Sequence, residues 1–305
     1  SYVDAGPAQA LLDAHRVGAV RNYERGSFDV DELLDYRDNR PPITFERDHF
    51  TGYQPPRISL HHLLDDSDEP FLLLAGPEPA LQWNRLTDEI EQLVDDLHVD
   101  LVVTVQGMPF PTPHTRPTIV TRMASDPSLL KDNQPLFDVA QMGASYPAVL
   151  ATKLAEDDHR VLGLVAHIPH YVAQSDYPNG SLALLDEINR LTVLNLPAAG
   201  LPVAATIIRD QIDAQVVENE EVQELVQGLE RRYDAMAKAR LMLPTAERLP
   251  SADEIGAEAE AFLRNLDMNA PRDLDVHLPP STGEPGNPRL DGSSDGDHDE
   301  DPQQG

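Results

Sequence analysis

The 305-residue sequence contains no cysteine. This absence excludes disulfide bonds, thiolate metal sites and cysteine nucleophiles, and it fits a reducing compartment, so we expect a cytoplasmic protein. Basic residues are also scarce: 23 lysines and arginines stand against 53 aspartates and glutamates, which gives a formal net charge of −30. Because so acidic a chain repels phosphate groups and anionic lipid heads, we expect neither a nucleic acid nor a membrane as its partner.

The common catalytic and phosphate-binding motifs are missing as well. There is no G-x-S-x-G turn, no G-x-G-x-x-G or G-x-x-x-x-G-K loop and no H-E-x-x-H motif. The longest uncharged stretch, residues 191–208, is broken by two prolines and a glycine, so we expect no membrane-spanning helix. The sequence begins with neither a methionine nor a leader pattern, and we expect a further strand to precede Ser1.

Three apolar runs dominate the first two thirds of the chain, at residues 71–75 (FLLLA), 101–105 (LVVTV) and 161–166 (VLGLVA). Such runs are typical of strands buried on both faces of a parallel sheet. They alternate with helical patterns at residues 79–97, 145–157 and 181–196. Shorter segments at 17–20, 43–45, 58–63 and 118–123 are expected to extend the sheet. The pattern predicts a layered α/β domain with a mostly parallel central sheet over residues 1–202.

Beyond residue 202 the strand signal disappears. Helical patterns cover residues 203–217 and 219–243, with Asn219 as the expected N-cap of the second. Ser251 and Glu254 form a capping-box signature for a last helix that ends near Leu266. We therefore expect a helical extension over residues 203–266. Residues 267–305 are rich in acidic residues and proline, and beyond Pro279 their only large aliphatic side chain is Leu290, so they are expected to form a disordered acidic tail.

Polar residues follow each of the three apolar runs. If the three strands are parallel, their carboxyl ends meet at one sheet edge and bring together a candidate ligand or interface site. Its residues are Asp4, Glu78, Gln106, His114, Arg116, His167 and His170. Such a set could bind an anion or transfer protons. The alternative is that these proline-rich loops only fix the chain path, with the histidines bonded to backbone carbonyls. Since Pro169 separates His167 from His170, we expect no metal pair there, and no cofactor.

Five segments, kept in order, carry a family resemblance: residues 3–6 (VDAG), 28–37 (FDVDELLDYR), 71–79 (FLLLAGPEP), 113–117 (PHTRP) and 167–174 (HIPHYVAQ). In combination they resemble the bacterial branch of the PAC2 family of proteasome-assembly-chaperone-like proteins, over residues 1–240. The resemblance implies a three-layer α/β/α domain similar to nucleoside phosphorylases but without their catalytic set. It also implies a homo-oligomer, for which a trimer is one candidate state.

The leading functional hypothesis is a non-enzymatic interaction or assembly-chaperone-like protein that self-associates and binds proteasome-related partners. Some relatives dock through a C-terminal hydrophobic-tyrosine-any-residue tail, but this chain ends in DPQQG and lacks it. The competing hypothesis is a phosphorylase-like or hydrolase-like enzyme that acts on a small anionic substrate at the carboxyl edge of the sheet. A third interpretation is that the same edge loops form a subunit interface.

Overall fold

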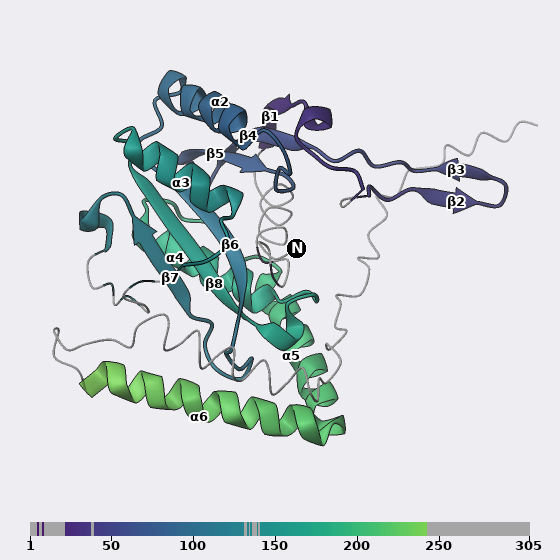
Figure 1. Cartoon of the computed structure of the whole chain (residues 1–305), viewed down its shortest axis with the longest axis vertical. Helices are drawn as coiled ribbons and strands as arrows, with labels where there is room; N and C mark the ends of the chain where they lie inside the picture. Colours follow the sequence, from purple (N-terminus) through teal and green to yellow (C-terminus); the bar gives the residue numbers. More distant parts are fainter. Residues whose placement is uncertain are drawn as a thin grey trace, which may run out of the picture.

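The computed structural model describes residues 5, 8, 22–37, 40–130, 133, 135, 139 and 141–242, which form a mixed α/β fold (Figure 1). Asp4, the expected strand at 17–20, the expected helix at 251–266 and the expected tail at 267–305 lie outside the described residues. Within the described part of the chain, no helix is both long enough and apolar enough to cross a bilayer.

The first sheet is antiparallel. Strands β1 (Asn22–Phe28), β4 (Ile58–Leu64) and β5 (Pro70–Ala75) pair in the order β1-β4-β5, and a short 3₁₀ turn, η1 (Val30–Glu32), follows β1. Only residues 65–69 join β4 to β5, and the Asp65 carboxylate holds this turn by accepting from the backbone N–H groups of Ser67 (2.7 Å) and Glu69 (2.8 Å). So short a connection permits only antiparallel neighbours.

The second sheet is mixed. Strands β6 (Val102–Phe110), β7 (Val120–Ala124) and β8 (Val161–Pro169) pair in the order β6-β8-β7, with β6 and β8 parallel and β7 antiparallel to β8. The prediction that the second and third apolar runs lie parallel is confirmed. The expectation of one mostly parallel sheet is wrong for the described strands, because β5, the first run, pairs with β4 in the other sheet.

Helices lie on both faces of the second sheet (Figure 1). Helices α2 (Trp83–Asp96) and α3 (Tyr146–Glu156) form one core with the β8 residue Val161. Helices α4 (Pro178–Leu191) and α5 (Leu201–Glu218) form the other core, against alternate β8 side chains that include Leu162 and Leu164. Two short 3₁₀ turns, η2 (Pro127–Leu130) and η3 (His170–Val172), follow β7 and β8. The strand β8 is buried along its whole length, which explains its unbroken apolar sequence.

Helix α6 (Glu220–Met242) completes the second core with Val222, Val226 and Leu229. The expected N-cap is confirmed: the Asn219 Oδ1 atom accepts from the N–H groups of Glu221 (3.0 Å) and Val222 (3.3 Å). Helices α5 and α6 thus share a core with β8, and the division into a helical extension over residues 203–266 stays a prediction.

A two-stranded hairpin, β2 (Thr44–Glu46) and β3 (His49–Thr51), projects away from the rest of the described structure (Figure 1). Phe45 and Phe50 are opposite each other on it, with ring centroids 5.0 Å apart, and they remain 60% and 66% exposed. Ile43 and Tyr53, on the connecting arms, are half exposed. We call residues 40–57 the hairpin arm.

Candidate functional site

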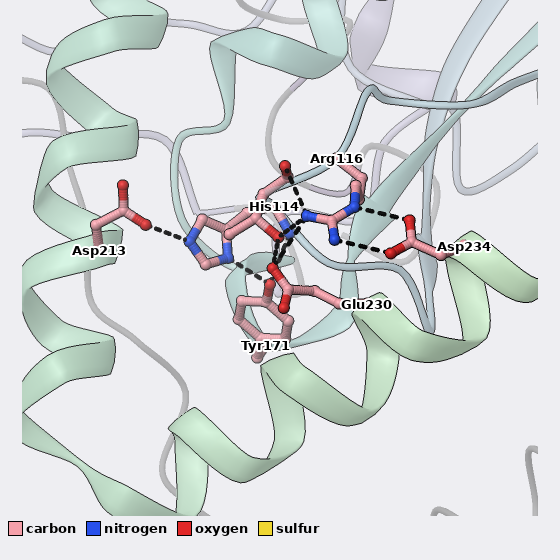
Figure 2. Close-up of polar contacts among 7 residues, drawn as sticks. His114, Arg116, Tyr171, Asp213, Glu230 and Asp234 are labelled. Carbon is pink, nitrogen blue, oxygen red and sulfur yellow. Dashed lines mark hydrogen bonds and ion pairs between the residues drawn. The ribbon is translucent and has the colours of Figure 1, made fainter.

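The loop that joins β6 to β7 carries His114 and Arg116, two of the predicted site residues. It lies against α5, α6 and η3 and contacts all three through polar side chains (Figure 2). The residues that complete this cluster are Thr115, Tyr171, Asp213, Glu230 and Asp234. We call these seven residues the loop cluster.

His114 is the buried centre of the loop cluster, only 1% exposed. Its backbone N–H donates to the Tyr171 Oη atom (2.8 Å), its Nδ1 atom lies 2.6 Å from the same oxygen, and its Nε2 atom lies 2.9 Å from Asp213 Oδ1. A carboxylate can only accept, so Nε2 carries the proton, and the Tyr171 hydroxyl donates to the bare Nδ1. Every polar atom of the imidazole and of the phenol then has a partner.

This arrangement requires a neutral imidazole. Burial lowers the pKa of His114, and this effect exceeds the opposing attraction of Asp213. Burial likewise raises the pKa of Tyr171, so the phenol remains protonated. A protonated His114 would place a second donor against the Tyr171 oxygen and leave the phenolic hydrogen without its acceptor. The hydrogen bonds among His114, Tyr171 and Asp213 therefore hold the loop, η3 and α5 together.

Arg116 joins the same loop to α6. Its Nε and Nη2 atoms donate to the two carboxylate oxygens of Asp234, both at 2.9 Å, and its Nη1 atom donates to Glu230 Oε1 at 3.1 Å. These bonds lower the pKa of Asp234 and raise that of Arg116. Next to this pair, the Tyr233 hydroxyl donates to the Pro117 carbonyl oxygen (3.1 Å). A bidentate arginine fixes orientation as well as distance, so the loop sets the direction in which α6 runs.

Glu78 and Gln106 lie together at another place, the N-terminus of α3. The Tyr146 N–H donates to Glu78 Oε1 (2.7 Å), and the Ser145 hydroxyl donates to Gln106 Oε1 (2.8 Å). The Ser145 oxygen also caps the helix by accepting from the Ala148 N–H. A carboxylate at a helix N-terminus satisfies unpaired donors and complements the helix dipole, so both side chains serve α3.

The two remaining histidines lie at the end of β8 and in the turn that follows it: His167 in β8 and His170 in η3. His167 is 3% exposed, its Nε2 atom lies 2.8 Å from Thr121 Oγ1, and its ring stacks at a tilt on Phe110. His170 contacts the Tyr171 ring edge to face, as does His114 on the same ring. The structure thus gathers His114 and His170 around Tyr171. Glu78 and Gln106 form a second group, and Asp4 lies outside the described residues.

Sequence reasoning missed Tyr171, Asp213, Glu230 and Asp234. The tyrosine directly follows the predicted His170, but nothing in the local sequence indicates that its hydroxyl bonds to His114 in a distant loop. The three carboxylates are on helices of a chain with 53 acidic residues, and their spacing resembles an ordinary solvent face. Among the described residues, no group of three or more histidines and carboxylates is arranged to hold a metal ion.

The fold and the loop cluster define a mixed α/β domain whose C-terminal helices are tied to a loop of its central sheet. The chain belongs to the PAC2 family, whose model matches residues 1–216. No curated protein matches the chain.

Three solved bacterial structures are similar over most of their length. An unknown function protein of Mycobacterium tuberculosis, Rv2714, is 40% identical, with a TM-score of 0.76 over 79% of this chain and 82% of that one. A protein of unknown function from Corynebacterium glutamicum is 34% identical, with a TM-score of 0.74 over 78% of this chain and 89% of that one. The Mycobacterium tuberculosis proteasome-assembly chaperone homologue Rv2125 is 26% identical, with a TM-score of 0.66 over 74% of this chain and 96% of that one.

Proposed function

We propose that this protein is a non-enzymatic, self-associating interaction protein with an assembly-chaperone-like role. The observation that carries the proposal is the hairpin arm, which holds four large apolar side chains, Ile43, Phe45, Phe50 and Tyr53, at 50% to 66% exposure on a projecting element. Aromatic residues displayed in this way are typical of protein contact surfaces and costly to leave in water. Family membership and the likeness to a proteasome-assembly chaperone homologue support the same class of function.

Charge indicates a second copy of the chain as the partner of the hairpin arm. Residues 40–57 contain three arginines and two acidic residues, a net charge of +1, whereas the other residues together carry −31. The arm is thus a cationic, aromatic projection from a strongly acidic protein, and the acidic body of another copy complements it. A closed ring of such contacts would produce the homo-oligomer that the family resemblance implies.

The geometry of the predicted site favours this function over the enzymatic alternative. The hydrogen bonds of four predicted site residues hold loops and helices in place; these residues are His114, Arg116, Glu78 and Gln106. Tyr171 is a buried phenol with a raised pKa, which makes it a poor nucleophile. A proteasome-related partner is the finer part of the proposal and rests on the family and on the relative named above.

The test is the oligomeric state of the full chain by light scattering coupled to gel filtration. We expect an oligomer for the native sequence and monomers for the double variant Phe45→Ser with Phe50→Ser. The matched control is Glu46→Ser with His49→Ser, an opposed pair on the other face of the same hairpin, which should stay oligomeric. A native chain that is monomeric at high concentration would refute self-association. Co-purification from native lysate tests the partner: recovery without proteasomal components would count against that part alone.

A further inference from the structure

The hairpin of the arm forms outside both cores of the protein. Strands β2 and β3 make a sheet of their own, and among the described strands each pairs only with the other. None of the residues 40–57 is buried, and residues 42–50 are all exposed. A single two-stranded hairpin is at best marginally stable in water, and independent stability requires a third strand or an element packed on its apolar face. The described residues outside the arm supply neither.

The hairpin also has little stabilisation of its own. Its register holds three opposed pairs, and the central one, Phe45 with Phe50, adds an edge-to-face ring contact. At the turn, Arg47 has a φ of 56°, in the left-handed region that residues other than glycine occupy at a cost. Three cross-strand pairs are few against the conformational entropy that two strands and their turn lose on folding. We therefore expect the hairpin by itself to be mostly unfolded.

A pair of prolines lies on each side of the hairpin, Pro41 with Pro42 before it and Pro55 with Pro56 after it. Proline fixes its own φ and disfavours helical backbone in the residue before it, so both roots of the arm favour extended backbone. These roots hold residues 43–54 away from the body of the protein. Since the roots are already restricted, the freedom that the arm loses on ordering comes mainly from the hairpin between them.

We propose that residues 44–51 are unfolded in the isolated chain and fold into the β2–β3 hairpin only when the arm binds a second copy. The proposal rests on the self-association proposed above. Burial of Phe45 and Phe50 against the acidic body of that copy supplies the stabilisation that the hairpin lacks. Part of the binding free energy orders the arm, so the contact is weaker and more readily reversed than one made by a preformed hairpin.

Trypsin reports on the arm at a single bond. Of the three arginines in the arm, Arg40 precedes a proline, before which trypsin does not cut, and Arg57 precedes Ile58, which is only 4% exposed in β4. The bond between Arg47 and Asp48 remains, at the turn of the hairpin. Because a protease cuts extended, locally unfolded backbone, the rate at this bond follows the unfolded fraction of the hairpin.

The full chain is digested below and above the midpoint concentration of its association, which light scattering provides. In the dilute chain the cleavage rate after Arg47 should lie within about threefold of the rate for a synthetic peptide of residues 40–57, and above the midpoint it should fall at least about tenfold. The monomeric control, Phe45→Ser with Phe50→Ser, should be cleaved at the fast rate at every concentration. Slow cleavage in the dilute native chain would show a hairpin that folds without a partner and would overturn the proposal.

A second measurement folds the hairpin before it binds. Thr44 and Thr51 are opposite each other on the face away from the two phenylalanines, and the sequence has no cysteine, so Thr44→Cys with Thr51→Cys introduces one disulfide across the strands. Oxidation should lower the midpoint concentration of association at least about tenfold relative to the same variant kept reduced, because ordering no longer opposes binding. Equal midpoints for the two forms would contradict folding on binding.

The two proposals fail in different ways. A chain that associates while its cleavage after Arg47 is independent of concentration refutes folding on binding and leaves self-association in place. A chain that light scattering shows to be monomeric at every concentration refutes self-association, and folding on binding a second copy with it.

Discussion

The hydroxyl of Tyr171 is the most informative single group in the loop cluster, and Tyr171→Phe removes it alone. In the structure this oxygen accepts from the His114 N–H and donates to the His114 Nδ1 atom. Tyr171 and His114 are only 6% and 1% exposed, so water cannot easily replace the lost partner. The variant therefore leaves one buried donor and one buried acceptor unsatisfied.

Each orphaned buried group costs about 1–3 kcal/mol, so we expect the loss of both partners in Tyr171→Phe to lower the free energy of unfolding by about 2–6 kcal/mol. That is a large part of the roughly 5–15 kcal/mol that stabilises a typical domain. Urea unfolding near neutral pH, at one fixed protein concentration, measures it as a shift of the midpoint at unchanged slope. The control is Tyr233→Phe, which removes an exposed hydroxyl bonded to the Pro117 carbonyl and should cost below about 1 kcal/mol. Equal, small effects of the two variants would show that the hydroxyl of Tyr171 is not part of a closed network.

Three further predictions follow from the same geometry. Because burial depresses the pKa of His114 below its unfolded value of 6.5, the unfolded chain binds the extra proton first, and stability should fall as the pH drops below about 6.5, by at most about 1.4 kcal/mol per pH unit; unfolding curves at pH 7.5 and 5.5 check this, and His114→Gln should lack that component. Arg116→Lys keeps the charge but loses the bidentate bond, so amide exchange along α6 should accelerate while α5 is unaffected, at a cost of about 1 kcal/mol since the guanidinium is partly exposed. Gly107→Ala would drive its new Cβ into the Ala5 carbonyl oxygen and should cost about 1–3 kcal/mol by thermal unfolding, more than Gly163→Ala, whose Cβ meets the flexible Met123 side chain.

Local sequence signals predicted most helices well. The helical patterns at residues 79–97 and 145–157 correspond to α2 and α3, and the expected Asn219 cap begins α6. These signals work because helix formation depends on neighbours three and four residues away. The boundaries in the structure differ from the predicted ones by only a few residues at most ends.

Strand direction could not be obtained in the same way. The apolar run of β5 looks like that of β8, but its direction is decided by the five residues that precede it and by the Asp65 carboxylate that closes that turn. A segment of 7 residues, β4, followed by so short a link and another strand was the signal for a hairpin. The prediction that β5 joins a parallel sheet was wrong because it rested on the apolar run and not on the short connection at residues 65–69.

The candidate site shows the limit of reasoning from residue types. His114 and Arg116 were identified because histidine and arginine in a proline-bounded loop can bind anions. Their actual partners, Asp213 and Asp234, lie about a hundred residues further along the chain, on helices where any exposed carboxylate looks alike. Only the packing of α5 and α6 against the sheet selects these two, and that packing depends on long-range apolar contacts.

Most of the predicted site residues have hydrogen-bond partners within the protein, whereas several large apolar side chains are exposed, and this contrast favours a function at the surface. In an enzyme, polar side chains at the site retain bonding capacity for a substrate, and replacing them removes activity while sparing the fold. Here His114, Arg116 and Glu78 are committed to holding α5, α6 and α3, so their replacement should act first on stability. The side chains that lack a suitable environment are exposed apolar residues on the hairpin arm and on the solvent-facing side of α5. Replacing those should leave the fold intact and change what the chain binds, which is the mutational signature of an interaction protein.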